Sequence, residues 1–201
     1  MERDQNSAGS PRCFPSYAVT LLLSVFLCVM GLSHSTPGST QGQITAEYQV
    51  KAAHLCNFTK FVEWPAGTFP AQDTALTIGI VGEDPFGQAL DAEALNVTNN
   101  GHKMVVERLH WDQNLRQCQV IFIGRTEKKH LGPILSNLKG ASILTVSEIE
   151  NFLPSGGMIG LIFDADRIRF EINLDPADDA HLRISSKLLS LARTVKGQPL
   201  H

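Results

Sequence analysis

The chain has 201 residues, of which 43% are hydrophobic, and its formal net charge at pH 7 is -3. Acidic and basic residues are interspersed along it, which argues against a nucleic-acid-binding protein with a basic stripe. The part beyond the first forty or so residues is long enough for one domain. A domain of that length buries about 70% of its unfolded surface and needs no metal or disulfide scaffold to fold.

Residues 1–35 are predicted to be a secretory signal peptide. The apolar run Tyr17–Leu32 follows a positively charged leader and precedes small and polar residues, with a cleavage position after Ser35. The run approaches the lower limit of about 17 residues for a membrane-spanning helix, so an uncleaved N-terminal anchor is the alternative. Residues 36–46 lie in a stretch rich in Ser, Thr, Gly, Pro and Gln and are predicted to be a flexible lead-in.

Residues 48–65 are predicted to form the helix around which the domain is organised. Pro65 is expected to end it, because a proline disfavours the helical conformation at the preceding residue, Trp64. A stripe at helical spacing holds Ala52, Leu55, Cys56 and Val62, whereas Phe58 and Phe61 point away from it. A helix that is apolar around most of its circumference is usually buried on more than one side. We expect the sheet to cover one face, and a second subunit, another element or a partner to cover the other.

The middle of the chain alternates between strands and helices. Predicted strands are 76–82, 103–109, 118–124 and 142–146, and predicted helices are 86–95, 126–138 and a short one from Ser147. Asp84 is expected to cap the first of these helices, with Pro85 at its first position. Ser147 and Glu150 match a capping box. Alternation at this spacing favours a parallel sheet with helices on both faces.

The C-terminal part departs from this alternation. Residues 158–163 and 167–173 are predicted to form a β-hairpin at the margin of the sheet, because the second strand alternates between apolar and charged residues. A last helix is expected to start at Ser185 or Ser186. Its apolar residues would pin it to the sheet: Ile184, Leu188, Leu191, Ala192 and Val195. The predicted fold is an α/β, Rossmann-like three-layer sandwich over residues 47–196, followed by a tail at 197–201.

Several short motifs follow one another in the chain: Val50-Lys-Ala-Ala53, Asn57-Phe-Thr-Lys-Phe-Val-Glu-Trp-Pro65, Ile78-Gly-Ile-Val-Gly82 with Asp84-Pro-Phe-Gly87, Cys118-Gln-Val-Ile-Phe-Ile-Gly124, Leu144-Thr-Val-Ser147, Gly156-Gly-Met-Ile159, Arg169-Phe-Glu-Ile-Asn173 and Ile184-Ser-Ser-Lys-Leu-Leu189. With these motifs, residues 48–192 resemble the YfiR family of small secreted bacterial domains. The resemblance implies a periplasmic α/β domain that binds the periplasmic sensor part of an inner-membrane diguanylate cyclase and holds it inactive. It would thereby lower cyclic di-GMP and biofilm formation.

Two sets of residues are candidates for binding. The aromatic side chains of Phe58, Phe61 and Trp64 are predicted to contact a partner or a second copy of the chain, because aromatic residues are enriched at the centres of interfaces. A second set, at the end of a strand, is predicted to line a ligand cleft or, alternatively, to form a plain structural turn: Gly82, Asp84 and Phe86. If the cleft exists, the protein is a ligand-sensing module that acts on a membrane signalling partner.

Cys56 and Cys118 remain after removal of the leader. They are a candidate disulfide in an oxidising compartment, and two buried thiols are the alternative. Gly156-Gly157 is predicted to be a turn, or else a close approach of backbone to a ligand or partner. No serine, cysteine or histidine belongs to a recognisable nucleophile constellation, and no two histidines have the i, i+4 spacing of metal ligands. We therefore expect a protein that is not an enzyme and holds neither a metal nor a cofactor.

Overall fold

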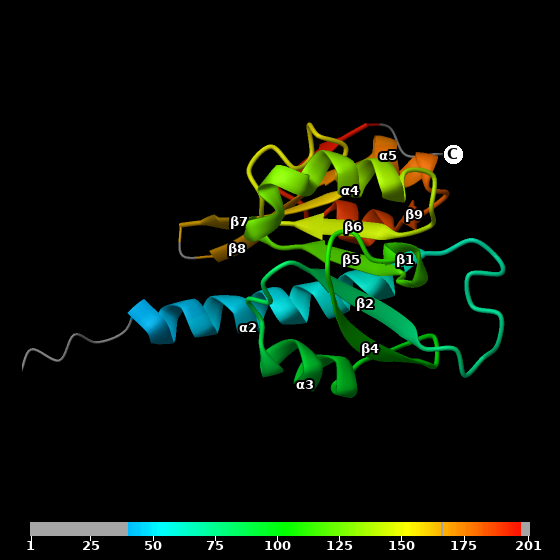
Figure 1. The fold of residues 1–201 in the computed structure, drawn as a ribbon, viewed down its shortest axis with the longest axis horizontal. Helices are drawn as coiled ribbons and strands as arrows, with labels where there is room; N and C mark the ends of the chain where they lie inside the picture. Colours follow the sequence, from blue (N-terminus) through cyan, green and yellow to red (C-terminus); the bar gives the residue numbers. More distant parts are fainter. Residues whose placement is uncertain (1–39, 166, 198–201) are drawn as a thin grey trace, which may run out of the picture. The chain divides into compact units, whose positions relative to one another are not determined.

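The computed structural model describes residues 40–165 and 167–197, so the predicted signal peptide at 1–35 lies outside the described residues. The main element is an eight-stranded sheet with strand order β10-β8-β7-β6-β5-β2-β4-β3 (Figure 1). Its strands are β2 (Leu76–Val81), β3 (Thr98–Asn99), β4 (His102–Leu109), β5 (Val120–Ile123), β6 (Leu144–Ser147), β7 (Ile159–Asp164), β8 (Arg167–Asn173) and β10 (Thr194–Lys196).

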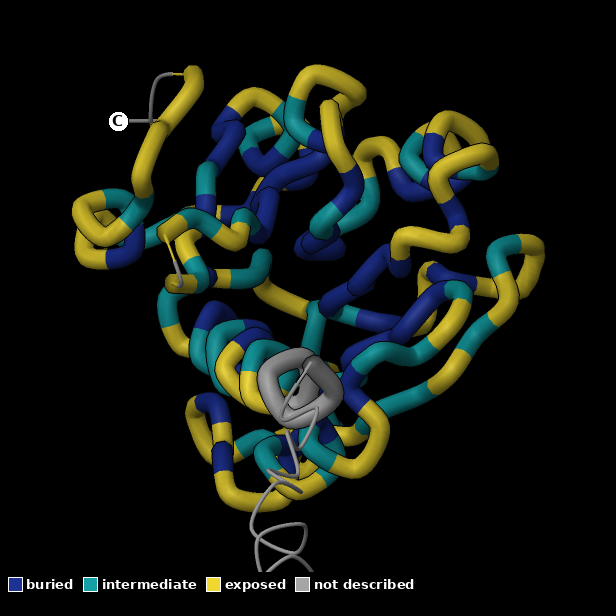
Figure 2. Tube along the Cα trace, turned by 90° about the vertical axis from the view of Figure 1, so that its left-hand side faces the viewer, coloured by how far each residue is buried: buried dark blue, intermediate teal, exposed yellow. Residues whose placement is uncertain are grey.

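The five central strands β4, β2, β5, β6 and β7 run parallel, and β8 is antiparallel to β7. Successive side chains point to opposite faces of a sheet. In β5, accordingly, Val120 and Phe122 belong to one hydrophobic cluster, and Ile121 and Ile123 to the other. α2 (Thr40–Phe58) and α3 (Gln88–Asn96) cover the first face, and α4 (Leu131–Leu138) covers the second (Figures 1 and 2). The predicted α/β sandwich with a mostly parallel sheet is confirmed.

α2 differs from the predicted helix at both ends. It starts at Thr40, so residues 40–46 of the predicted flexible lead-in are helical, and it ends at Phe58 rather than at Pro65. A 3₁₀ turn, η1 (Thr59–Phe61), and the short strand β1 (Val62–Glu63) follow. β1 pairs with β9 (Arg183–Ile184), so tertiary pairing overrides the local helical pattern. α3 and β8 of the same chain lie against α2, while Val50 remains 47% exposed.

Two predicted helix starts are wrong. α3 begins at Gln88, because the Asp84 carboxylate accepts hydrogen bonds from the N–H groups of Phe86 and Gly87 and holds a turn there. The capping box at Ser147 opens no helix. The Ser147 hydroxyl instead donates to the Ile123 carbonyl and accepts from the Ile149 N–H. The helix expected over 126–138 is a 3₁₀ segment, η3 (Arg125–His130), followed by α4.

The expected C-terminal helix is mostly absent from the described residues. After α5 (Leu174–Asp179) and β9, the Ser185 hydroxyl caps α6 by accepting from the Leu188 N–H, but α6 spans only Ser186–Leu189. The chain then forms β10, which pairs in parallel with β8. The hairpin of β7 and β8 is therefore one strand in from the margin. Leu191, which was expected to pin the helix, is 63% exposed.

Candidate functional site

The carboxyl edge of the parallel strands is the usual place for a ligand in a sheet of this kind. Here the crevice between the ends of β2 and β5 is filled by the chain itself. A Cβ added to Gly82, whose φ is +91°, would lie 2.7 Å from Thr126 Oγ1 and 2.7 Å from Glu127 Cγ. The Glu83 N–H also donates to Thr126 Oγ1 at 3.1 Å. The ligand cleft predicted at Gly82 is therefore closed.

The other two residues of the predicted cleft are structural. Phe86 is buried, with its ring centroid 5.7 Å from that of Tyr48 and 4.7 Å from that of Phe122. Asp84 forms an ion pair with Arg108 at 2.9 Å, and Arg108 Nη1 donates to Asp91 at 2.8 Å. The Arg108 hydrogen bonds lower the pKa of Asp91. The structural-turn interpretation of this segment is the one that the structure favours.

A buried ionic cluster lies next to this turn and was not predicted from the sequence. Lys51, on α2, is only 1% exposed and forms ion pairs with Glu47 and with Glu148, which directly follows β6. The Tyr48 hydroxyl donates to Glu148 Oε1 at 2.7 Å, and Arg125 Nε lies 3.0 Å from the same oxygen. Burial, together with the hydrogen bond to Glu148, raises the pKa of Tyr48. The cluster neutralises its own charges and ties α2 to the carboxyl edge of the sheet.

Two signals in the sequence could have indicated this cluster. Lys51 lies four residues after Glu47 and four before Leu55, so a cation falls within the apolar part of the helix next to an i, i+4 acid. Glu148 follows a strand without charged residues, Leu144–Ser147, where a carboxylate that turns inward needs a cation.

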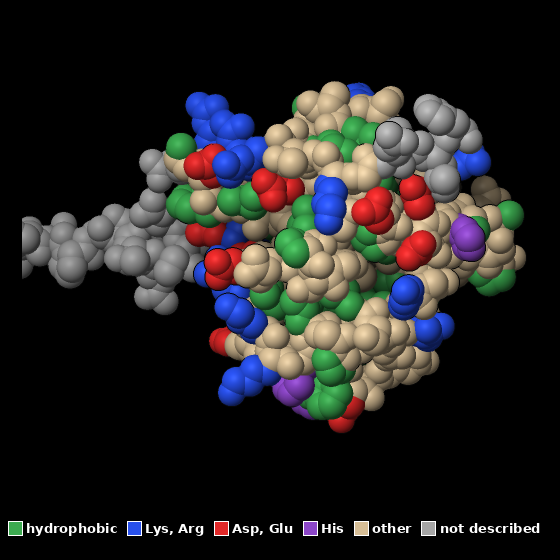
Figure 3. Space-filling view, turned by 90° about the horizontal axis from the view of Figure 1, so that it is seen from above, with side chains coloured by type: hydrophobic (Ala, Val, Ile, Leu, Met, Phe, Trp, Pro, Cys, Tyr) green, Lys and Arg blue, Asp and Glu red, His purple; other side chains and the backbone are tan. Residues whose placement is uncertain are grey.

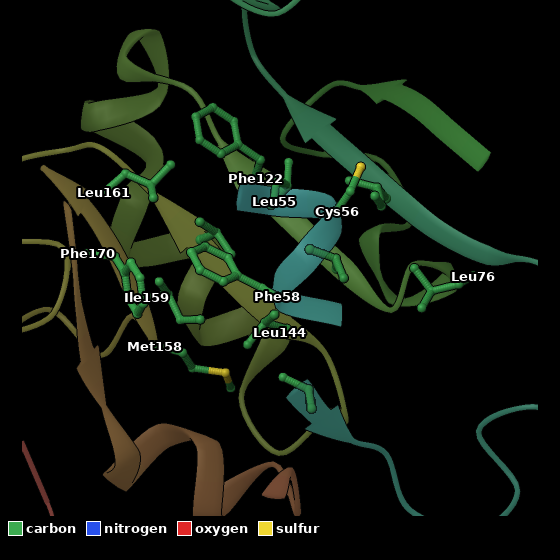
Figure 4. Packing of buried hydrophobic residues seen from close by; sticks show 14 of the residues in the cluster. Leu55, Cys56, Phe58, Leu76, Phe122, Leu144, Met158, Ile159, Leu161 and Phe170 are labelled. Carbon is green, nitrogen blue, oxygen red and sulfur yellow. The ribbon is translucent and has the colours of Figure 1, made fainter. Parts of the chain in front are cut away.

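The three predicted contact residues have different environments. Phe58 is 2% exposed and packs in the core, with ring centroids 5.0 Å from Phe170 and 5.9 Å from His54 (Figure 4). The prediction that Phe58 contacts a partner is therefore wrong, because its own chain covers it. Phe61 and Trp64 are half-buried. The Lys187 ammonium lies 5.7 Å from the centroid of the Phe61 ring.

Trp64 lies at one end of a short row of aromatic rings. Its ring meets that of Phe69 edge-on at 6.0 Å, and Phe69 stacks on His102 at 4.3 Å. The indole Nε1 of Trp64 is buried and has no hydrogen-bond partner among the residues that the structure describes. An unsatisfied buried donor costs free energy.

Cys56 and Cys118 are free, buried thiols, so the candidate disulfide is wrong. They belong to the two hydrophobic clusters on opposite faces of the sheet, and the sheet separates them. Burial raises the pKa of each thiol to about 12.

We expect neither thiol to react with iodoacetamide in the folded protein at neutral pH, because both are shielded and protonated. In denaturant without reductant, mass spectrometry of a chain that starts at residue 36 should show two adducts. A chain that gains adducts only after reduction would show that the thiols are bonded to each other.

Over residues 40–165 and 167–197, no three His, Cys, Asp or Glu side chains are grouped as a metal site would require. In the same ranges no helix has the length and apolarity to cross a bilayer.

Comparisons with known proteins agree with the fold. One solved structure, a conserved domain protein from Vibrio cholerae, matches with a TM-score of 0.54 and 14% sequence identity, over 72% of this chain and 60% of that chain. At this identity the likeness concerns the fold alone. The model of the YfiR/HmsC-like family matches residues 48–193. The match covers most of the chain and the sequence motifs that resemble this family, so the protein belongs to the YfiR/HmsC-like family.

Proposed function

We propose that this protein is exported to the periplasm by its signal peptide, binds an inner-membrane diguanylate cyclase and holds it inactive, which lowers cyclic di-GMP and biofilm formation. YfiR/HmsC-like domains are periplasmic, regulatory and non-enzymatic, and they imply a membrane partner in diguanylate cyclase signalling. One observation supports a function in which the protein surface contacts a partner. The crevice at Gly82, where this fold usually takes a ligand, is filled by Thr126 and Glu127.

Trp64 is the residue that we propose at the centre of the contact, with Phe61 beside it in the chain. Truncating an aromatic anchor of an interface commonly costs about 2 kcal/mol or more. The Nε1 of Trp64 is buried and unpaired among the described residues, so a movement of the ring that exposes it would let it donate to the partner. Repression requires tighter binding to the inactive than to the active cyclase. A shift from 1:99 to 99:1 takes about 5.5 kcal/mol of differential affinity.

The test is a cyclase assay in membranes that carry a diguanylate cyclase with a periplasmic sensor part. Wild-type protein should suppress cyclic di-GMP synthesis. We expect Trp64→Ala to need about 30-fold more protein for the same effect, which corresponds to about 2 kcal/mol.

Trp111→Ala is the matched control, because Trp111 is also half-buried but stacks on His130 at 4.5 Å, in the other hydrophobic cluster. Both variants are first compared with wild type by thermal unfolding. Equal repression by folded Trp64→Ala and wild type would refute the assignment. A second copy of the chain is the alternative occupant of this surface, and sedimentation of wild type and Trp64→Ala distinguishes it.

A second candidate function, a ligand-sensing module that acts on a membrane signalling partner, is favoured by one observation. A pocket lies at the edge of the sheet opposite to the closed crevice, between α4 and α5.

A further inference from the structure

The pocket has a volume of about 440 Å³ and lies between α4, the loop at 153–156 and α5. Thr145 lies near the start of β6, Met158 just before β7 and Asn173 at the end of the antiparallel β8, which places the pocket at the amino edge of the parallel strands. Its volume lies within the range of about 300–1,000 Å³ of small-molecule sites. Figure 3, a view of the domain from above, shows acidic and basic side chains near one another with hydrophobic side chains between them.

The interior of the pocket is lined by apolar side chains and by two buried polar ones. Leu138 and Met158 are buried apolar lining residues. Thr145 and Asn173 are 3% and 4% exposed. Thr145 Oγ1 accepts from the Met158 N–H, and Asn173 Nδ2 donates to the Leu153 carbonyl. Among the hydrogen bonds of the described residues, none uses the Thr145 O–H or a second Asn173 N–H, so each retains a donor for a ligand.

The mouth of the pocket carries charges of both signs. Lys139, directly after α4, and Lys196, at the end of β10, line it, and Asp175 and Asp179 line it from α5. All four are exposed, and none forms an ion pair with another residue in the described part of the chain. Burial and the neighbouring Asp175 and Asp179 raise the pKa of Asp178, which shows that negative charge is concentrated along α5.

We propose that this pocket binds a small zwitterion with an apolar side group, of the type of an aliphatic amino acid. The lysines attract its carboxylate, which also accepts hydrogen bonds from the donors of Thr145 and Asn173. The aspartates attract its ammonium group, and Leu138 and Met158 contact its side group. Neither Phe61 nor Trp64 lines the pocket, so this inference does not depend on the proposed partner contact.

Calorimetric titration of the whole chain with leucine, isocaproate and isopentylamine tests the proposal, because the last two lack the ammonium and the carboxylate respectively. We expect saturable binding of leucine, and binding at least tenfold weaker for each of the other two. Lys196→Gln should weaken leucine and isocaproate but not isopentylamine, whereas Asp179→Asn should weaken leucine and isopentylamine but not isocaproate.

Lys129→Gln is the matched control, since Lys129 is exposed on η3 outside the pocket, and Ser136→Trp at the mouth should abolish binding. Absence of saturable leucine binding overturns the proposal, and so does equal binding of all three probes. Leucine binding that appears only after deletion of residues 198–201 also overturns it for the whole chain. A failure of leucine to bind would leave the proposed contact at Trp64 unaffected, because the cyclase assay contains no leucine.

Discussion

Replacing Glu148 by leucine is expected to lower the free energy of unfolding by about 3–5 kcal/mol. Removing one partner of a buried ion pair leaves the other charge buried without compensation. Lys51, 1% exposed, would keep only Glu47, and the Tyr48 hydroxyl would lose its acceptor. Urea unfolding should show a lower midpoint with an unchanged m value.

Glu150→Leu is the matched control, because Glu150 is two residues away and 80% exposed, and its effect should stay within about 0.5 kcal/mol. The double variant Lys51→Met with Glu148→Leu should be more stable than Glu148→Leu alone, since apolar side chains then replace both charges. If Glu148→Leu and Glu150→Leu lose equal stability, the ionic cluster does not hold α2 in place.

Phe58→Ala should cost about 3–5 kcal/mol of stability, the range found when a buried phenylalanine is truncated. The side chain is 2% exposed and packs against the rings of His54 and Phe170, so alanine would leave a cavity between α2 and β8. Phe163→Ala, at a position 46% exposed on β7, should change stability far less. Guanidinium unfolding of both variants provides the measurement. A Phe58→Ala variant that keeps wild-type stability but loses repression would restore Phe58 to the contact surface.

The parallel sheet was predictable from sequence because β2 and β5 are compact runs of mostly β-branched and aliphatic residues, and strands alternate with helical segments along the chain. β2, β5 and the hairpin of β7 and β8 differ from their predicted bounds by only a few residues. Helix ends were less predictable. α2 was expected to continue to Pro65, yet Val62 pairs with Ile184, a contact between residues far apart in the chain that periodicity cannot reveal.

The prediction of a C-terminal helix was wrong for the same physical reason, pairing between residues far apart in the chain. Leu188, Leu191 and Val195 recur at helical spacing, but the free edge of β8 offers backbone partners, and the Arg193 N–H donates to the Phe170 carbonyl at 2.8 Å. At the candidate sites, residue type selected Trp64, which is half-buried and whose contact with a partner stays a prediction. It could not separate Trp64 from Phe58, which lies on the side of α2 that β8 covers.

The pairing of β1 with β9 constrains when the fold can be completed. Val62 pairs with Ile184, and β8 is flanked by β10, so residues 183–196 are needed to complete both sheets. Contacts between distant parts of a chain form late, because the loop between them must close first. A chain that folds as it emerges therefore stays incomplete until residues 183–196 are available, and a truncated chain would lack the partner strands of β1 and β8.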